Sequence, residues 1–349
     1  MKRKITKTVH VRGIPVGGGN PIPVQSMTNT PTENAAATLA QIGRLQAAGC
    51  EIVRLAVPNA LAARALPEIR RGTDMPLVAD IHFDYRLALA AVEAGFDKIR
   101  INPGNIGSPE RVRMVADACR ERGVPIRIGV NSGSVEKELL NKYGLCPKAL
   151  CESALGHARI LESCGFDDIC ISIKASDVAM TVEANRLLST LCDYPLHVGV
   201  TEAGTKERGI LKSAAGIGSL LLDGIGDTIR VSLTDAPEEE ARTGTELLRA
   251  LGLRQGVQFV SCPSCGRTQY DLIGTAKTVE ERLRDKPWNI TVAVMGCVVN
   301  GPGEASHADY GIAGGKSEGV IFKHGEPVAR VASDKLADAL VELIERENR

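Results

Sequence analysis

Aromatic residues make up only 3% of this 349-residue sequence, and its formal net charge at pH 7 is zero. Proteins that bind single-stranded nucleic acid usually present aromatic side chains for base stacking, and binders of anionic surfaces carry a basic excess. Because neither feature is present, we expect no nucleic-acid partner and no membrane partner. Any site for an anion must be a local cluster of cations.

Long apolar runs are also lacking. No run reaches the roughly 18 residues that a membrane-spanning helix needs. The basic amino terminus, MKRKITKTVHVRG, is not followed by the apolar stretch of a secretory signal. We therefore expect a cytoplasmic protein, in which the ten cysteines are thiols or metal ligands and not a disulfide framework.

Eight short β-branched runs alternate with segments of helical periodicity over the first two thirds of the chain. The runs are residues 23–27, 52–57, 77–82, 98–102, 126–131, 169–174, 197–202 and 228–233. Strands that alternate with helices pair in parallel through right-handed crossovers, and eight such units indicate a (β/α)8 barrel of the TIM type. An open doubly wound sheet is the alternative, but residues 28–31 (TNTP) lack the GxGxxG turn typical of that fold.

Local signals add detail to this architecture. Residues 9–21 alternate around Gly17–Gly19 and predict a hairpin that closes the bottom of the barrel. A helix is predicted from Ala35 to Ala48, with Thr32 as its N-cap and Gly49 just beyond its end. Past Gly252 the pattern changes to a small α+β module with strands at 258–261 and 290–295, helices at 278–285 and 334–347, and a hairpin at 319–331. We therefore expect two domains, residues 1–252 and 253–349.

The ends of the predicted barrel strands are polar, and barrel enzymes carry their sites at the C-terminal ends of the strands. Five of these ends contribute a cation: Arg54, Arg100, Arg127, Lys174 and Arg230. Arginine makes bidentate contacts to phosphate oxygens and lysine supplies a point charge, so the cluster predicts a site for a compact phosphorylated anion. Pairing of each cation with a neighbouring carboxylate is the alternative.

Other polar residues at the same strand ends are candidates for chemistry or orientation. Asp80, His82 and Glu202 are predicted to act in proton transfer beside the anion. Glu202 should stay ionised among the cations and could stabilise positive charge. His82 could equally serve only as a hydrogen-bonding residue. Asn102 and Asn131 are expected to orient the substrate.

The second domain contains a metal-ligand pattern. Cys262 and Cys265 form a C-x2-C pair after a predicted strand, and Cys297 precedes a Gly- and Pro-rich turn that contains Glu304. A C-x2-C pair alone suits zinc, an iron–sulfur cluster or a dithiol redox site. A structural zinc ribbon would need a second pair, whereas three thiolates hold three irons of a cubane and leave one iron open. We therefore predict a 4Fe–4S cluster, with Glu304 as a candidate ligand of the fourth iron.

Eight segments together resemble one known family, the bacterial 4-hydroxy-3-methylbut-2-enyl diphosphate synthases of the non-mevalonate isoprenoid pathway. The resemblance covers essentially the whole chain. The segments are VQSMTNT (24–30), ADIHFD (79–84), IRINPGN (99–105), IGVNSGS (128–134), SIKASD (172–177), VTEAG (200–204), SCPSCGR (261–267) and MGCVVNGPGE (295–304).

The resemblance implies that the barrel binds 2-C-methyl-D-erythritol 2,4-cyclodiphosphate, and that Cys262, Cys265, Cys297 and Glu304 hold a 4Fe–4S cluster. Two electrons would open the cyclic diphosphate and remove a hydroxyl as water. The resemblance also implies a homodimer in which the cluster domain of one subunit caps the barrel of the other, with flavodoxin or ferredoxin as electron donor. From the residues alone, a zinc-dependent barrel enzyme and a non-enzymatic iron–sulfur carrier stay as alternatives.

Overall fold

All eight predicted barrel strands are present in the computed structural model, which describes residues 2–297, 303 and 305–348. The strands are β3 (Gln25–Met27), β4 (Ile52–Ala56), β5 (Leu77–Asp80), β6 (Lys98–Ile101), β7 (Ile126–Asn131), β8 (Ile169–Lys174), β9 (His197–Val198) and β10 (Thr228–Ile229). Strands β3 to β8 pair in parallel in sequence order, and β9 pairs with β10 in parallel. Bridges from Ile171 to Leu196 and from Val24 to Ile229 close the ring. The TIM-type barrel is confirmed.

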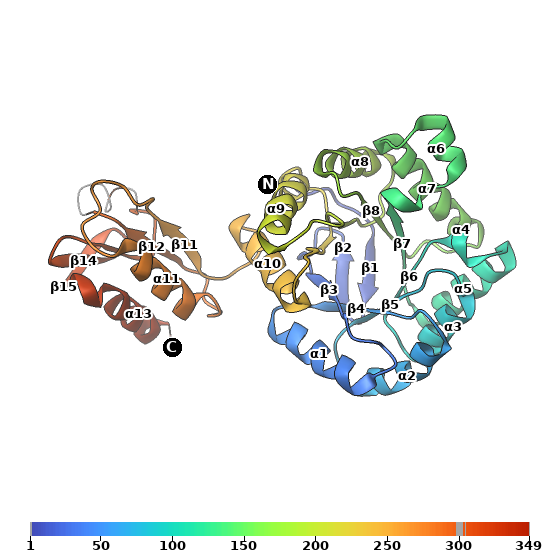
Figure 1. Cartoon of the computed structure of the whole chain (residues 1–349), viewed down its shortest axis with the longest axis horizontal. Coiled ribbons are helices and arrows are strands. Elements are labelled where there is room, and N and C mark those ends of the chain that lie inside the picture. The colour runs from blue at the N-terminus through green and yellow to red at the C-terminus, as the bar shows by residue number, and fades with distance from the viewer. Residues whose placement is uncertain (1, 298–302, 304, 349) are drawn as a thin grey trace. The chain divides into compact units, whose positions relative to one another are not determined.

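At least one helix follows each strand, and Figure 1 shows these helices outside the ring of strands. They are α1 (Ala35–Ala47), α2 (Ala60–Arg71), α3 (Tyr85–Glu93), α4 (Pro103–Ile106), α5 (Pro109–Arg122), α6 (Lys137–Tyr143), α7 (Pro147–Ser163), α8 (Val178–Leu191), α9 (Lys206–Leu222) and α10 (Pro237–Ala250). Each longer helix buries one apolar stripe. On α5 the stripe is Val112, Val115, Ala116 and Cys119, the spacing of a single helix face.

The start of α1 differs from the prediction. Its N-cap is Asn34, whose side chain accepts a hydrogen bond from the Ala37 amide, so the prediction of Thr32 is wrong. The Thr32 hydroxyl instead donates to the Ala56 carbonyl at the end of β4 (2.6 Å). Two capping residue types stand close together here, and the tertiary contact with β4 decides which one caps the helix.

A hairpin of β1 (Thr8–Val11) and β2 (Ile14–Gly17) precedes the barrel, and Figure 1 shows it lying across the ring of strands. Its turn is Arg12–Gly13, both with positive φ (46° and 79°), so the prediction of a turn around Gly17–Gly19 is wrong. The hairpin packs its valines on the N-terminal ends of three barrel strands, in a cluster of Val9, Val11, Val16, Ile52, Val78 and Cys170. It therefore closes the bottom of the barrel, as predicted, and leaves the opposite end for a site.

Contact density divides the chain into the units Met1–Leu251 and Gly252–Arg349. The second unit is a five-stranded mixed sheet with two helices: β11 (Gln258–Ser261), β12 (Thr291–Met295), β13 (Tyr310–Ala313), β14 (Glu318–Lys323), β15 (Glu326–Ala332), α11 (Leu272–Leu283) and α13 (Leu336–Glu347). The helix predicted at 278–285 begins earlier, and β13 was not predicted. Its Gly311 packs tightly against Phe322, a contact without a local sequence signal. No helix in the described ranges is long and apolar enough to cross a membrane.

Candidate functional site

A cavity of about 120 Å³ lies at the C-terminal ends of the barrel strands, which we call the barrel mouth. The five cations noted in the sequence all line it: Arg54, Arg100, Arg127, Lys174 and Arg230. Side chains alternate along a strand, and parallel register brings inward positions of neighbouring strands to the same level. Arg100 on β6 is thus beside Arg127 on β7, and Asn131 on β7 is beside Lys174 on β8.

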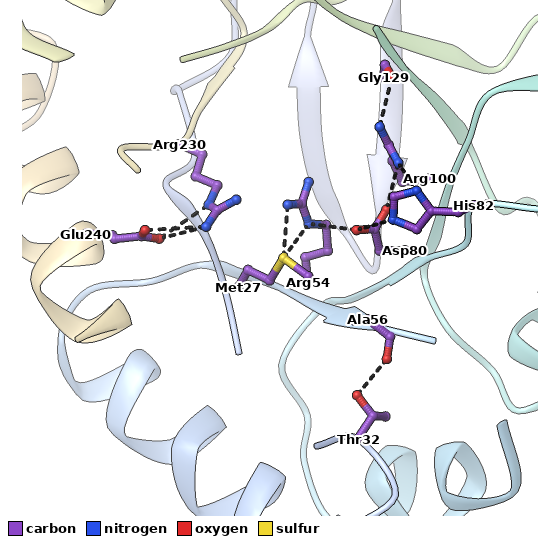
Figure 2. A network of polar contacts seen from close by, with 10 residues as sticks. All are labelled: Met27, Thr32, Arg54, Ala56, Asp80, His82, Arg100, Gly129, Arg230 and Glu240. Carbon is purple, nitrogen blue, oxygen red and sulfur yellow. Dashed lines mark hydrogen bonds and ion pairs between the residues drawn. The ribbon is translucent and has the colours of Figure 1, made fainter. Parts of the chain in front are cut away.

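One buried carboxylate, Asp80 at the end of β5, joins two of these cations (Figure 2). It lies 3.2 Å from Arg100 and 3.7 Å from Arg54, and the His82 ring nitrogen Nε2 is 3.6 Å away. Burial by itself would raise the pKa of Asp80, but Arg54, His82 and Arg100 together hold this pKa below its ordinary value. Asp80 is therefore an ionised anchor that orients the arginines, and it is a poor proton donor at neutral pH.

A second carboxylate, Glu240 on α10, was not found in the sequence. It is buried and forms an ion pair with Arg230 at 3.2 Å, and Figure 2 shows the two side chains facing each other. Ser26 on β3 also donates a hydrogen bond to it. The residue lies in an acidic run at the start of a helix, a pattern that reads as a solvated first turn. Only the packing of α10 on the barrel reveals its role.

Two carboxylates, Asp80 and Glu240, are too few to neutralise the five cations of the barrel mouth. In the described part of the chain, neither Arg127 nor Lys174 takes part in an ion pair, and Arg127 Nε and Nη2 have no hydrogen-bond partner. Arg127 is only 1% exposed, and burial lowers its pKa to about 10. Buried cations without a counter-charge are costly, so an anionic ligand would stabilise this arrangement.

Two glycines of the barrel wall make room for the cations, and the sequence analysis missed both. Arg100 donates to the Gly129 carbonyl at 2.8 Å, and a Cβ on Gly129 would lie 2.4 Å from Arg100 Nε. A Cβ on Gly199 would lie 2.8 Å from Lys174 Nζ. Glycine inside a strand is a recognised sign of close approach, so this signal was available in the sequence.

Replacing Gly129 with alanine is therefore expected to push Arg100 away from Asp80. We expect kcat/KM to fall about tenfold or more and the free energy of unfolding to fall by about 1–3 kcal/mol. Steady-state kinetics and thermal unfolding measure both effects. Gly133→Ala is the matched control, because nothing lies within 4 Å of a Cβ built there. Equal behaviour of the two variants would contradict this account.

The other candidates for orientation and proton transfer are placed differently. Asn131 and His82 line the cavity. Asn102 is buried behind its wall, where its side chain accepts a hydrogen bond from the Gly129 amide at 3.0 Å. Glu202 is exposed, has a positive φ of 52°, and is not among the described residues that line the cavity. The structure thus joins Asp80, His82 and Asn131 to the cations and leaves Glu202 on the loop outside.

In the second unit, the loops after β11 and β12 bring two predicted ligands to one sheet edge. The strands are parallel neighbours, with Ser261 opposite Val294, so Cys262 and Cys297 leave the sheet at the same end. A Cβ on Gly296 would lie 3.8 Å from the Cβ of Cys262, which places the residue before Cys297 beside that cysteine. Cys265 lies exposed in the following turn, where hydrogen bonds with Arg267 lower the pKa of its thiol.

Three thiols at the carboxyl edge of adjacent strands are a donor set that suits an iron–sulfur cluster or zinc. Among the described residues, no three His, Cys, Asp or Glu side chains come close enough together to hold a metal ion. The fourth predicted ligand, Glu304, lies outside the described residues. The other seven cysteines are free thiols in the barrel unit. Cys146 and Cys192 are half-buried, and the buried ones are Cys50, Cys119, Cys151, Cys164 and Cys170.

Comparison with known families covers both units. Residues 6–245 match the family model described as the GcpE TIM-barrel domain, and residues 258–346 match that of the GcpE protein C-terminal domain. Among solved structures, N-acetylneuraminic acid (sialic acid) synthetase from Leptospira borgpetersenii superposes with a TM-score of 0.51 at 12% identity, over 71% of this chain and 90% of that one. A similarity at that identity concerns the fold alone.

Curated relatives match over nearly their whole length. The chain is 59% identical over 348 residues to the 4-hydroxy-3-methylbut-2-en-1-yl diphosphate synthase (flavodoxin) of Geobacter sulfurreducens, covering 99% of this chain and 98% of that protein. It is 58% identical to the protein of the same name from Clostridium perfringens, covering 99% of each. With both family models and these identities, the chain belongs to the GcpE family, the 4-hydroxy-3-methylbut-2-en-1-yl diphosphate synthases (flavodoxin).

Proposed function

We propose that the protein converts 2-C-methyl-D-erythritol 2,4-cyclodiphosphate into (E)-4-hydroxy-3-methylbut-2-enyl diphosphate and water. The observation that carries this proposal is the barrel mouth, where five cations and one carboxylate, Asp80, line a single cavity. A cyclic diphosphate is a compact dianion that such a cavity suits. The relatives are named after the diphosphate product, which supports the same reaction.

In this proposal the barrel binds and orients the substrate. Arg54, Arg100, Arg127, Lys174 and Arg230 bind the two phosphoryl groups, and Asn131 orients the carbon skeleton. Asp80 holds Arg54 and Arg100 in place, and Asn102 supports the wall behind them. His82 is exposed beside Asp80 and is a candidate proton carrier. Glu202, on the loop after β9, is retained as a candidate for stabilising positive charge.

The cluster domain supplies the redox chemistry in the same proposal. Cys262, Cys265, Cys297 and Glu304 would hold a 4Fe–4S cluster, which provides electrons and an iron with affinity for oxygen when it is bound. Two electrons break the bond between a ring carbon and its phosphate oxygen. The hydroxyl on the adjacent carbon leaves with a proton as water, and a carbon–carbon double bond forms. In the same proposal, Glu304 would be the ligand of the fourth iron that the substrate could replace.

The partners follow from the family and from the thiols. Flavodoxin is the proposed electron donor, because the relatives carry it in their names, with ferredoxin as the second candidate. We propose a homodimer in which the site is shared between subunits. The seven cysteines of the barrel unit are free thiols, which supports a reducing, cytoplasmic compartment.

Anaerobic turnover with this cyclic diphosphate, dithionite and a viologen mediator tests the proposal on protein whose iron and sulfide have been counted. We expect product formation by a brown protein with about four irons per chain. If the protein is colourless and contains zinc, the redox reaction would be ruled out in favour of the zinc-dependent alternative. Transfer of the cluster to another protein without turnover would favour an iron–sulfur carrier. Full turnover and an unchanged spectrum in Glu304→Ala would remove Glu304 from the ligand set.

A further inference from the structure

Beneath the barrel mouth lies a layer of fully buried polar side chains that the proposed reaction does not use. We call it the barrel floor and define it by Gln25, Lys98 and His197. Lys98 Nζ, both ring nitrogens of His197 and both amide atoms of Gln25 have no hydrogen-bond partner among the described residues. Lys98 is two residues before Arg100 on β6, so its side chain lies on the same inward face, roughly 6–7 Å below.

The groups around Lys98 give it no negative charge. Those that face it are Arg54 on β4, Arg127 on β7, Cys170 on β8 and His197 on β9. Burial raises the pKa of the Cys170 thiol, which therefore stays neutral. Asp80 on β5 is one level higher, opposite Arg100, and is already shared by two arginines.

Burial and neighbouring cations work against the charged form of these bases. Burial lowers the pKa of Lys98 to about 8. Cys170 opposes this effect, and Arg127 and Arg54 add to it. Burial also lowers the pKa of Lys174 well below its ordinary value, where Arg127, Arg230 and Arg54 add to the effect and Glu240 opposes it. Without an anion, part of this group of bases is therefore neutral under mildly alkaline conditions. A dianion bound above these bases would favour their charged forms and raise their pKa values.

We propose that binding of a doubly charged anion at the barrel mouth draws protons onto the buried amines beneath it, Lys98 foremost. This inference rests on the proposed function, because it requires that the mouth binds the cyclic diphosphate. Binding and protonation are then linked, and the affinity falls by up to about tenfold per pH unit above pH 8. The proposed reaction also consumes a proton when the hydroxyl leaves as water.

The cyclic diphosphate is a clean probe of this coupling. Each of its phosphorus atoms carries a single acidic proton that is lost well below neutral pH, so the ligand itself neither gains nor loses protons. Calorimetric titration of the unreduced holoenzyme, under anaerobic conditions at pH 8.5 in buffers of different ionisation enthalpy, therefore counts protons taken up by the protein. We expect about one proton per ligand for the parent enzyme.

The variant Lys98→Met tests how much of the proton uptake is due to this one base. It removes a buried amine without a partner, so the variant is expected to fold at least as stably as the parent. Its proton uptake should fall to about half of the parental value or less. Lys277→Met, at an exposed position on α11, is the matched control and should keep the parental value.

The outcomes distinguish the inference from the function on which it rests. Binding without proton uptake, or unchanged uptake in Lys98→Met, would overturn the inference and leave the proposed function intact. Absence of binding, by calorimetry and by equilibrium dialysis, would overturn the proposed function. The pH dependence of the parental Kd gives the proton count independently of any variant, and a Kd that is flat between pH 7 and 9.5 would also overturn the inference.

Discussion

Turnover is expected to fall below about 1% of the parental rate when Cys262, a proposed ligand of the cluster, is replaced by serine. Loss of a group that only hydrogen-bonds to a metal ligand already costs about 10- to 100-fold, and loss of a ligand itself should cost more. Cys262 follows β11 directly and lies beside the turn that leads to Cys297. A hydroxyl at this position binds iron far less well than a thiolate. Iron content should therefore fall from about four per chain to less than one, with loss of the brown colour.

Cys192→Ser is the matched control for this variant. Both cysteines are half-buried, but Cys192 lies at the end of α8 in the barrel unit. Iron analysis, visible absorbance and turnover should all be unchanged in the control. A Cys262→Ser protein with full iron content and full activity would show that this cysteine is not a ligand, and the predicted cluster site would have to be reassigned.

The second large effect is expected at Arg127, where methionine should lower kcat/KM for the cyclic diphosphate by about 30- to 3,000-fold. This range corresponds to the loss of about 2–5 kcal/mol when one partner of a buried charge pair is truncated. The stability of the empty protein should not fall. Arg127 is buried, has two nitrogens without hydrogen-bond partners and takes part in no ion pair among the described residues, so methionine removes an uncompensated charge and keeps much of the volume.

Steady-state kinetics and thermal unfolding of the same preparation check both halves of this prediction. Arg44→Met is the matched control, because Arg44 is an exposed arginine on α1 whose ion pair with Glu238 lies on the surface. Such pairs contribute little, so its kinetics and stability should stay close to those of the parent. An Arg127→Met enzyme with parental kcat and KM would remove this residue from the anion site.

Much of the barrel could be predicted because its signals are local. Each strand is a short β-branched run and each helix a periodic segment, and alternation of the two restricts the topology to parallel crossovers. The clustering of Arg54, Arg100 and Lys174 follows from the same rule, since the carboxyl ends of parallel strands meet at one end of the ring. The C-x2-C spacing of Cys262 and Cys265 is likewise a property of a single turn.

The wrong predictions of the α1 N-cap and of the hairpin turn share a physical cause. In each case two nearby candidates carry the same local signal, and only packing selects between them. Thr32 and Asn34 are both of a type that caps helices. The Thr32 hydroxyl is bound to the end of β4, so Asn34 caps α1. The glycines at 17–19 and the Arg12–Gly13 pair are both turn signals, and the register of β1 with β2 selected the second.

The sequence by itself determined the barrel class, the smaller α+β unit and the cysteine spacing, because each is set by residues close together in the chain. It also determined the ring of cations, because each cation lies on a barrel strand or directly after one and the topology brings those strands together around one cavity. Only the tertiary structure decided the charge balance of the mouth. Glu240 reaches Arg230 from a helix, Gly129 lets Arg100 lie against the wall, and Glu202 stays outside the cavity. Pairing and burial depend on which side chains meet across strands and helices, and those distances arise only when the ring closes.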